Sequence, residues 1–251
     1  MAALSGRTRG GAKSPESESP RALIVMNETL GNLVGLTLQH GSYELRRSTD
    51  PQECRDLVTD WAPHIAFLDL DLYEQFIDIV GRGLTHGHTP IIAFTRRRDT
   101  ALKLSAYERG ADDIIEVPFT LDEIVARPFA LIRRAHGISV TIVPKIKLDG
   151  LEVDLIEQRV SVSGRDLHLT PIQQTLLYLL AANAGKALSR EDLLSTMWGG
   201  EFEIESNVVD RHIRELRVKL GDEWRAPRYI ETVPGAGYRF KSQSVVSTAA
   251  E

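Results

Sequence analysis

Two aspartates, Asp69 and Asp71, close an apolar stretch that is typical of a buried strand, HIAFLDLD at 64–71. Carboxylates at this spacing after a strand fit a nucleophile and an acid, the pair that a phosphatase uses to form an aspartyl intermediate. Such an enzyme also needs a lysine at a neighbouring strand end, and none stands there. The residues therefore favour a protein that is not an enzyme.

Strands and helices alternate along the segment that contains these aspartates. Strands are predicted at 22–25, 43–48, 64–71, 90–95 and 112–117, and helices at 32–39, 51–61, 100–109 and 121–135. This alternation predicts an α/β doubly wound domain with a parallel five-stranded sheet, whose functional edge is formed by the carboxyl ends of the strands. The residues at that edge are Met26 to Glu28, Asp69, Thr95 and Val117.

A basic amphipathic helix is predicted at 206–220, SNVVDRHIRELRVKL. Its apolar stripe is Val209, Ile213, Leu216 and Leu220, and its outward arc is Asn207, Arg211, Arg214, Glu215 and Val218, with Arg217 and Lys219 on the flanks. Ser206 is a suitable N-cap, and Gly221 can end the helix in the left-handed conformation. Outward cations suit a helix in a DNA major groove, although a solvated surface helix has the same pattern.

A glycine-rich hairpin follows, with strands predicted at 229–233 and 238–241 around Pro-Gly-Ala-Gly. A basic helix that leads into such a hairpin is the arrangement of a winged helix. Upstream, 148–170 alternates apolar and polar residues as an antiparallel sheet does. Thr170-Pro171-Ile172-Gln173 then opens a helix with an N-cap, a helix-starting proline and a reciprocal glutamine.

Residues 145–242 resemble the effector domain of winged-helix response regulators of two-component signalling, the subfamily named for bacterial osmotic and phosphate regulators. The matching segments are LTPIQQTLLYLLAANAGKALSREDLLSTMWG at 169–199, NVVDRHIRELRVKLGD at 207–222 and YIETVPGAGYRF at 229–240, in order and without a gap. The resemblance implies a winged-helix α+β domain that binds double-stranded DNA and regulates transcription.

The resemblance also implies which side chains contact DNA. Arg211, Arg214 and Glu215 would face base edges, and Asn207 lies on the same arc of the helix. The contacts to the DNA backbone, including those from the wing, would be made by His212, Arg217, Thr232, Tyr238 and Arg239. Glu215 can accept from a cytosine amine but cannot donate to guanine. Pro234 replaces the wing arginine of many relatives, which predicts weak wing readout. The loop at 198–205, with Phe202 and Ile204, would contact RNA polymerase.

Residues 21–137 resemble the receiver domain of response regulators. The resemblance places Asp69 at the phosphoryl-accepting position and Thr95 at the position of the switching hydroxyl. Most of the supporting residues differ: Met26 and Asn27 replace the acidic pair that holds Mg²⁺, Val117 replaces the lysine, and Ile114 the aromatic switch. Phosphoryl transfer needs Mg²⁺ and a lysine to spread the developing charge, and Mg²⁺ disfavours thioether ligands. We therefore expect an atypical receiver that uses neither metal nor cofactor.

The resemblance also implies that the residues of the family's dimer face are present in this chain. Across a two-fold axis, Lys103 would pair with Glu123 and Asp112 with Arg127, around an apolar patch of Leu104, Tyr107 and Val125. All four charges have the expected sign, although ordinary helix-surface charges would look the same. Pro128 inside the last receiver helix removes a backbone bond to Ile124 and can bend this face.

Composition agrees with a two-domain cytoplasmic protein. The 251 residues carry a net charge of −5, which excludes coating of DNA by overall charge and requires a local basic face. The single cysteine, Cys54, fits a reducing compartment, and no apolar run approaches the roughly 20 residues that cross a membrane. We expect a disordered tail at 1–20, the receiver at 21–137, a linker at 138–146, the effector domain at 147–242 and a tail at 243–251.

Three functional hypotheses follow. The favoured one is a transcription factor that binds direct-repeat DNA as a receiver-mediated homodimer without phosphorylation, so that Asp69→Asn leaves operator affinity unchanged. The alternative keeps a partner histidine kinase that phosphorylates Asp69, with Glu28 and Asp71 recruiting the metal. The third is the phosphatase, which leaves the DNA-binding segment unexplained.

Overall fold

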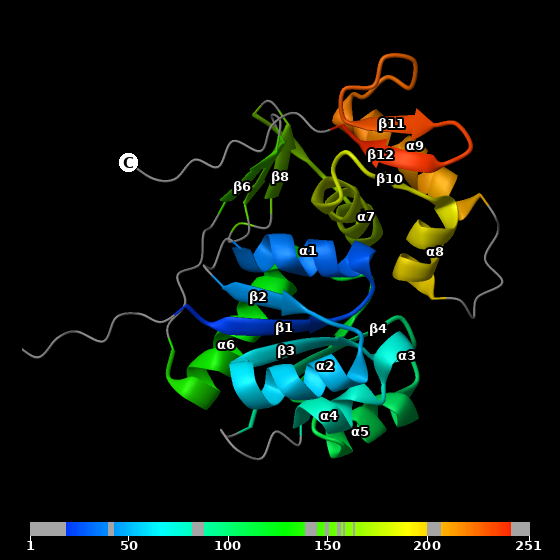
Figure 1. Ribbon diagram of the computed structural model, residues 1–251. Helices are drawn as coiled ribbons and strands as arrows, with labels where there is room; N and C mark the ends of the chain where they lie inside the picture. The colour runs from blue at the N-terminus through cyan, green and yellow to red at the C-terminus, as the bar shows by residue number, and fades with distance from the viewer. Residues whose placement is uncertain are drawn as a thin grey trace, which may run out of the picture.

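The computed structural model describes residues 19–39, 43–81, 88–138, 145–148, 151–154, 157, 159–162, 164–199 and 207–241. An amino-terminal α/β domain and a carboxyl-terminal α+β domain lie against each other (Figure 1), so the predicted fold class is confirmed. Residues 1–18 of the predicted amino-terminal tail, the predicted carboxyl-terminal tail and most of the predicted linker lie outside the described residues. No helix in the described ranges has both the length and the apolar character that crossing a membrane requires.

Five parallel strands form the receiver sheet in the order β2-β1-β3-β4-β5. They are β1 Arg21–Val25, β2 Glu44–Arg47, β3 Ile65–Asp69, β4 Ile91–Thr95 and β5 Asp113–Glu116. Asp69 pairs in register with Phe94, and Thr95 is one residue further along β4. The ends of β3 and β4 therefore bring the candidate acceptor and hydroxyl to the same edge.

Helices cover both faces of this sheet. Successive side chains of a strand point to opposite faces, and in the buried strands the side chains on both faces are apolar. One face packs on α1 Glu28–Gln39 and α6 Leu121–His136. The other packs on α2 Pro51–Asp56, its π-helical continuation Leu57–Trp61, α4 Phe76–Gly81 and α5 Thr100–Glu108. Pro128 lies inside α6, which continues past it as one helix.

The segment after β3 differs from the prediction of one strand over 64–71. The strand ends at Asp69, whose side chain accepts from the Asp71 backbone N–H at 3.2 Å and starts the short helix α3, Leu70–Tyr73. Helices α3 and α4 span four and six residues, too few to show a helical repeat in the sequence. This turn places Asp71 beside Asp69 instead of on the next pleat of a strand.

The described part of the effector domain contains two antiparallel sheets and three helices. The first sheet is β6 Lys145–Leu148, β7 Leu151–Asp154, β8 Arg159–Val162 and β9 Arg165–Leu167. The helices are α7 Pro171–Ala182, α8 Arg190–Trp198 and α9 Val208–Leu220. The second sheet has the order β10-β12-β11, with β10 Ala187–Leu188, β11 Ile230–Val233 and β12 Gly237–Phe240. The β11–β12 hairpin is the predicted wing.

The predicted cap of α7 also fixes the position of α9. Thr170 accepts from the Gln173 backbone N–H at 3.3 Å and donates its own N–H to Gln173 Oε1 at 3.1 Å. Gln173 Nε2 then donates to Glu215 at 2.9 Å, while Lys219 Nζ donates to Gln173 Oε1 at 2.7 Å. At the carboxyl end of α9, Gly221 adopts the predicted left-handed conformation, with φ of 67°. Ser206 lies outside the described residues, and Asn207 occupies the N-cap position.

A continuous hydrophobic core joins the two domains, and α1 packs against α7 (Figure 1). Polar contacts also cross the boundary. The Thr175 hydroxyl donates to the Phe119 carbonyl at 2.7 Å. Asn183 donates to the Thr29 carbonyl at 3.1 Å and accepts from Asn32 Nδ2 at 2.8 Å. The effector domain is therefore docked on the receiver through both apolar and directional contacts.

Candidate phosphoacceptor pocket and DNA-binding surface

Asp69 lies in a closed, charged pocket at the carboxyl edge of the receiver sheet. Its side chain is 0% exposed, and Arg96, the residue directly after β4, is 7% exposed. Arg96 Nη1 donates to Asp69 Oδ1 at 2.5 Å and to Asp71 Oδ2 at 3.2 Å. The Arg96 backbone N–H also donates to Asp71 Oδ2, at 2.8 Å. One arginine therefore bridges the two aspartates.

Thr95 is turned toward Asp71. Its hydroxyl donates to Asp71 Oδ1 at 2.6 Å and accepts from the Arg97 backbone N–H at 3.0 Å. Asp71 thus contacts the Thr95 hydroxyl, the Arg96 guanidinium and the Arg96 backbone N–H. Both oxygens of this carboxyl group are engaged within the domain.

The arginine keeps its charge in this buried position. Burial lowers the pKa of Arg96, but the hydrogen bonds and charges of Asp69 and Asp71 outweigh it, so the pKa is raised above the ordinary value. In the described part of the chain, Asp69 Oδ2 and Arg96 Nη2 have no hydrogen-bond partner. The ion pair is consequently the main compensation that each buried charge receives.

The residues at the end of β1 do not fit a magnesium site. Met26 is buried, and Asn27 Oδ1 accepts from the Leu30 backbone N–H at 2.9 Å as a helix cap. Glu28, which the kinase alternative assigned to the metal, accepts from Lys186 Nζ of the effector domain at 2.6 Å, and this bond lowers the pKa of Glu28. A cation between the aspartates would also have to share its place with Arg96. Within the described ranges, no group of three or more His, Cys, Asp or Glu side chains could hold a metal.

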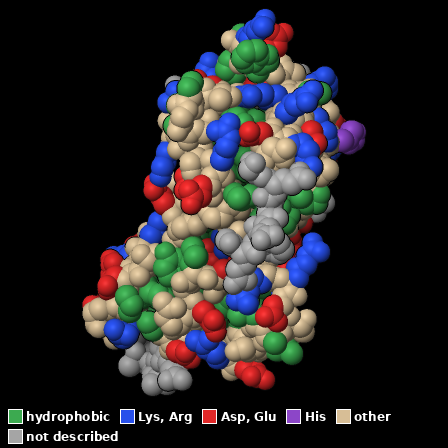
Figure 2. All heavy atoms as spheres, turned by 90° about the vertical axis from the view of Figure 1, so that its right-hand side faces the viewer, with side chains coloured by type: hydrophobic (Ala, Val, Ile, Leu, Met, Phe, Trp, Pro, Cys, Tyr) green, Lys and Arg blue, Asp and Glu red, His purple; other side chains and the backbone are tan. Residues whose placement is uncertain are grey.

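The outward face of α9 carries the clearest candidates for base contacts. Arg211 and Arg214 are exposed, while Val209, Ile213 and Leu216 on the opposite side are buried as predicted. Lys and Arg side chains are spread over the effector end of the molecule in Figure 2. The two arginines are one helical turn apart and are therefore able to reach neighbouring bases in a groove.

Two further DNA candidates are directed inward and support the domain. His212 has only 12% of its side chain exposed and stacks on Trp198, with ring centroids 5.9 Å apart. Arg217 donates to the Ile230 carbonyl at 2.8 Å and to the Thr232 hydroxyl at 2.9 Å. Arg217 thus holds the wing against α9, which ties up the guanidinium and the hydroxyl that were assigned to phosphates.

The wing candidate Tyr238 is also engaged within the domain. Its hydroxyl donates to Asp210 at 2.6 Å, and Arg190 donates to the same carboxylate at 2.7 Å. Burial, together with the hydrogen bond to Asp210, raises the pKa of Tyr238. Arg239 pairs with Glu231 across the hairpin. These contacts set the orientation of the wing before any DNA is bound.

The face formed by α5, β5 and α6 presents apolar residues beside charges that are paired within the chain. Leu104 and Tyr107 are 58% and 46% exposed, and Val125 is half-buried. Lys103 pairs with Glu116, and Arg127 contacts both Asp113 oxygens at 2.9 Å and Glu123 at 2.7 Å. Asp112, which the sequence comparison pairs with Arg127 of a second protomer, accepts within the chain from the Ile91 backbone N–H at 2.8 Å and contacts His88 at 2.9 Å.

Comparison with known proteins agrees with this architecture. The family described as "Transcriptional regulatory protein, C terminal" matches residues 164–240. Response regulator ArlR of Staphylococcus aureus is 35% identical over 218 residues, which cover 86% of this chain and 97% of that protein. This chain belongs to the response regulators. It is a DNA-binding transcriptional regulator with a winged-helix effector domain, and it is not an enzyme.

Two solved structures are also similar to this chain in sequence. DrrB of Thermotoga maritima, an OmpR/PhoB homolog, is 27% identical, and the match covers 89% of this chain and 99% of DrrB with a TM-score of 0.39. The DNA-binding domain of Klebsiella pneumoniae RstA, in complex with the RstA box, is 30% identical over 39% of this chain and 98% of that domain, with a TM-score of 0.37.

Sequence reasoning missed two features of this response regulator. Arg96 belongs to the run Arg96 to Arg98, which looks like an exposed loop, and only the proximity of the β3 and β4 ends turns it inward. Trp224 is 69% exposed and lines a groove of about 670 Å³ with Arg214, Val218 and Arg225. This exposed aromatic side chain lies beside arginines at the outward face of α9.

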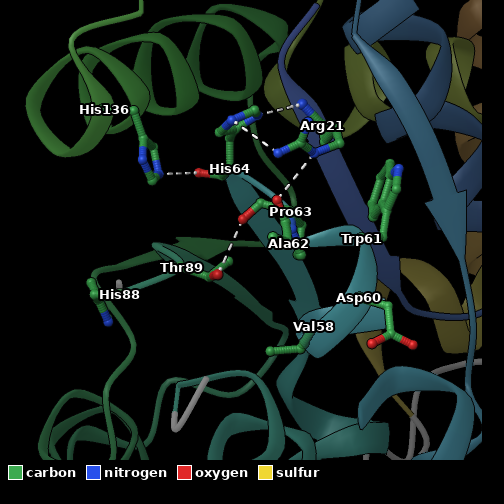
Figure 3. Close-up of a pocket in the computed structure, with 10 residues that line it drawn as sticks. All are labelled: Arg21, Val58, Asp60, Trp61, Ala62, Pro63, His64, His88, Thr89 and His136. Atoms are coloured by element: carbon green, nitrogen blue, oxygen red, sulfur yellow. Dashed lines mark hydrogen bonds between the residues drawn. The ribbon is translucent and has the colours of Figure 1, made fainter. Parts of the chain in front are cut away.

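A second concavity of about 500 Å³ lies at the opposite, amino edge of the receiver sheet (Figure 3). The Arg21 backbone N–H donates to His64 Nδ1 at 2.9 Å, and Arg21 Nε donates to the Ala62 carbonyl at 3.1 Å. His136, the last residue of α6, donates to the His64 carbonyl at 3.0 Å. These bonds fasten the end of α6 to the sheet just before the interdomain linker.

The inward position of His212 predicts a pH dependence of stability. Burial lowers the pKa of His212 below its ordinary 6.5. The unfolded chain therefore binds this proton more readily, so the contribution to stability is complete above about pH 6.5 and is lost as the pH falls through the folded-state pKa. Chemical unfolding between about pH 7 and about pH 5 should show a shallower loss of stability in His212→Gln than in the unsubstituted protein.

The matched control is His168→Gln, because His168 is exposed. It should keep the pH dependence of the unsubstituted protein. Identical slopes for His212→Gln and the unsubstituted protein would contradict the assignment.

Proposed function

We propose that this response regulator binds direct-repeat DNA as a homodimer formed through its receiver, and that it does so without phosphorylation of Asp69. The observation that carries the proposal is the contact of the Arg96 guanidinium with both Asp69 and Asp71, at 2.5 Å and 3.2 Å. The acceptor aspartate already has a permanent cationic partner. It therefore has no need of an added metal ion for charge compensation.

The burial of Asp69, its ion pair and the residues at the expected Mg²⁺ position all disfavour phosphoryl transfer to this side chain. Asp69 Oδ1 is held by Arg96, Oδ2 is buried, and the whole residue is 0% exposed. The attacking carboxylate would have to give up its ion pair, while the Met26 and Asn27 corner supplies no second acid for Mg²⁺. The conventional alternative, with a partner histidine kinase, requires Arg96 to leave this pocket first.

The dimer proposal rests on the exposed apolar pair Leu104 and Tyr107 and on the charges around it. Arg127 and Glu123 hold each other at 2.7 Å and are thereby fixed in position on the rim of this face. A two-fold interface needs such a self-complementary surface. The same patch of each protomer forms the contact, so that a residue pair formed in one direction is also formed in the other. Contact with RNA polymerase through the 198–205 loop stays a prediction, because 200–206 lie outside the described residues.

Incubation of the unsubstituted protein with Mg²⁺ and radiolabelled acetyl phosphate tests the proposed independence from phosphorylation. We expect no acid-labile label on the protein, since Arg96 occupies the charged pocket. Label that disappears in Asp69→Asn would establish the kinase alternative instead. A conventional response regulator, treated in parallel, verifies the phosphodonor.

Substitution of the exposed α9 arginines tests DNA readout. Arg211→Ala and Arg214→Ala should each cost about 1–3 kcal/mol on a duplex selected from a random library with the unsubstituted protein, and less on nonspecific DNA. Quantitative gel-shift titration at fixed salt measures both affinities. Arg98→Ala, an exposed arginine of the receiver, is the matched control and should change neither. Equal losses on both duplexes would assign these side chains to phosphates.

A charge placed on the apolar patch tests the dimer. Tyr107→Asp should weaken self-association by roughly 10-fold or more, because the two-fold axis brings two like charges together in an apolar contact. Sedimentation velocity over a concentration series measures the change. Leu72→Asp, at an equally exposed leucine away from this face, should leave association unchanged. Dimers that persist in Tyr107→Asp would place the interface elsewhere.

A further inference from the structure

We propose that the pocket around Asp69 holds the effector domain as its ligand: Arg96 binds the carboxyl end of α8 and thereby sets the position from which the chain continues to the recognition helix. This inference rests on the DNA-binding role of α9 and is separate from the proposed independence from phosphorylation. It assigns the pocket a structural occupant from the same chain.

Arg96 acts on α8 as a cationic helix cap. Its Nε donates to the Thr196 carbonyl at 2.9 Å, and both residues are buried. Thr196 is two residues from the end of α8, so its carbonyl is among those left without a partner inside the helix. A cation is favoured at this end of a helix because the aligned peptide dipoles leave it partly negative. The guanidinium thus connects the carboxylates of β3 and α3 to the end of α8.

Gly199 shows that the arginine stem fits closely against the end of this helix. It caps α8 with φ of 78°, and its N–H donates to the Ser195 carbonyl at 3.0 Å. A Cβ at this position would lie 3.6 Å from Arg96 Cβ and 3.8 Å from Arg96 Cδ. Glycine supplies the positive φ of this cap, and the Arg96 stem lies within van der Waals range of it.

The end of α8 is in turn packed against the recognition helix. Trp198 stacks on His212 of α9, with 18° between the ring planes and 5.9 Å between centroids. His212 lies between the exposed Arg211 and Arg214 in sequence, on the adjacent, inward side of the helix. A contiguous set of contacts therefore runs from Asp69 through Arg96, the end of α8 and Trp198 to α9.

Other polar contacts between the domains do not involve Arg96. Thr175 of α7 bonds to Phe119, and Asn183, which caps α7, bonds to Asn32, while α7 packs on α1. Loss of Arg96 should accordingly loosen the end of α8 while α7 stays docked. A change confined to the end of α8 would indicate that Arg96 positions this helix. A general loss of stability would change α7 as well.

Hydrogen exchange of the full-length protein, followed by mass spectrometry, tests the proposal. Arg96→Gln should raise exchange at 195–199 on the order of 10-fold or more and leave the α7 amides unchanged. Arg96→Lys should not restore protection. The planar guanidinium directs its N–H groups at two carboxylates and a carbonyl at once, and a single ammonium group cannot reproduce that arrangement of donors. Arg98→Ala is the control. Unchanged exchange at 195–199 in folded Arg96→Gln would overturn the proposal.

A second variant covers the case in which Arg96→Gln does not fold. Asp69→Asn keeps the size of the side chain and removes the charge that holds the guanidinium, so it should raise exchange at the same amides. Unchanged protection there would also overturn the proposal. The double variant Arg96→Gln/Asp69→Asn, if it folds, should show no faster exchange at 195–199 than Arg96→Gln alone. Both substitutions remove the same contact, so their effects should not add. A conventional phosphoacceptor would be revealed by acyl-phosphate label, which these exchange measurements do not involve.

Discussion

The ion pair between Arg96 and Asp69 constrains what the receiver can do. Removal of one partner from a buried ion pair typically costs about 3–5 kcal/mol, because the other charge stays buried without compensation. Asp69 is 0% exposed, so this penalty applies to it directly. The aspartate therefore has a structural reason to be present that is independent of phosphate chemistry. The same holds for Asp71, which organises Thr95 and the backbone of Arg96.

This constraint explains how the receiver fold persists with an altered edge. Val117, the strand end at which the resemblance leads one to expect a lysine, is a buried valine, and the cation of this edge is Arg96, the residue after Thr95. Arg96 is long enough to reach across the ends of β3 and β4 and still donate to Thr196 in the other domain. A cation supplied by the chain is permanently bound, whereas a metal ion is exchangeable. The pocket thus becomes part of the packing between domains.

The effector domain uses its cations in a similar way. Arg217 and Lys219 hold the wing and the start of α7, and only part of the basic helix stays available to DNA. Arg211 and Arg214 then carry the outward charge on a chain whose net charge is −5. Two exposed cations one helical turn apart on α9 favour binding in the orientation that brings this stripe to the phosphates.

Sequence patterns identified the features that repeat or that obey local rules. The five strands, the apolar stripe of α9 and the reciprocal cap of Thr170 and Gln173 follow from periodicity and capping chemistry. Helices α3 and α4 were missed because they are short. Within the chain, Arg127 meets Asp113, a contact that the sequence comparison did not predict, and the pairing of Arg127 with Asp112 across a two-fold axis stays a prediction. The roles of Arg96 and His212 depend on contacts between distant segments, which local patterns do not contain.

The ion pair also changes the meaning of a common genetic test. From the sequence, Asp69→Asn seemed a neutral substitution in a regulator that is not phosphorylated. In the structure it removes one of the two carboxylates around a buried guanidinium, and Arg96 in turn contacts α8. A loss of DNA binding in this variant therefore has two physical causes, loss of a phosphoryl group or loss of an ion pair. Direct detection of an acyl phosphate separates them, because the ion pair leaves no such chemical product.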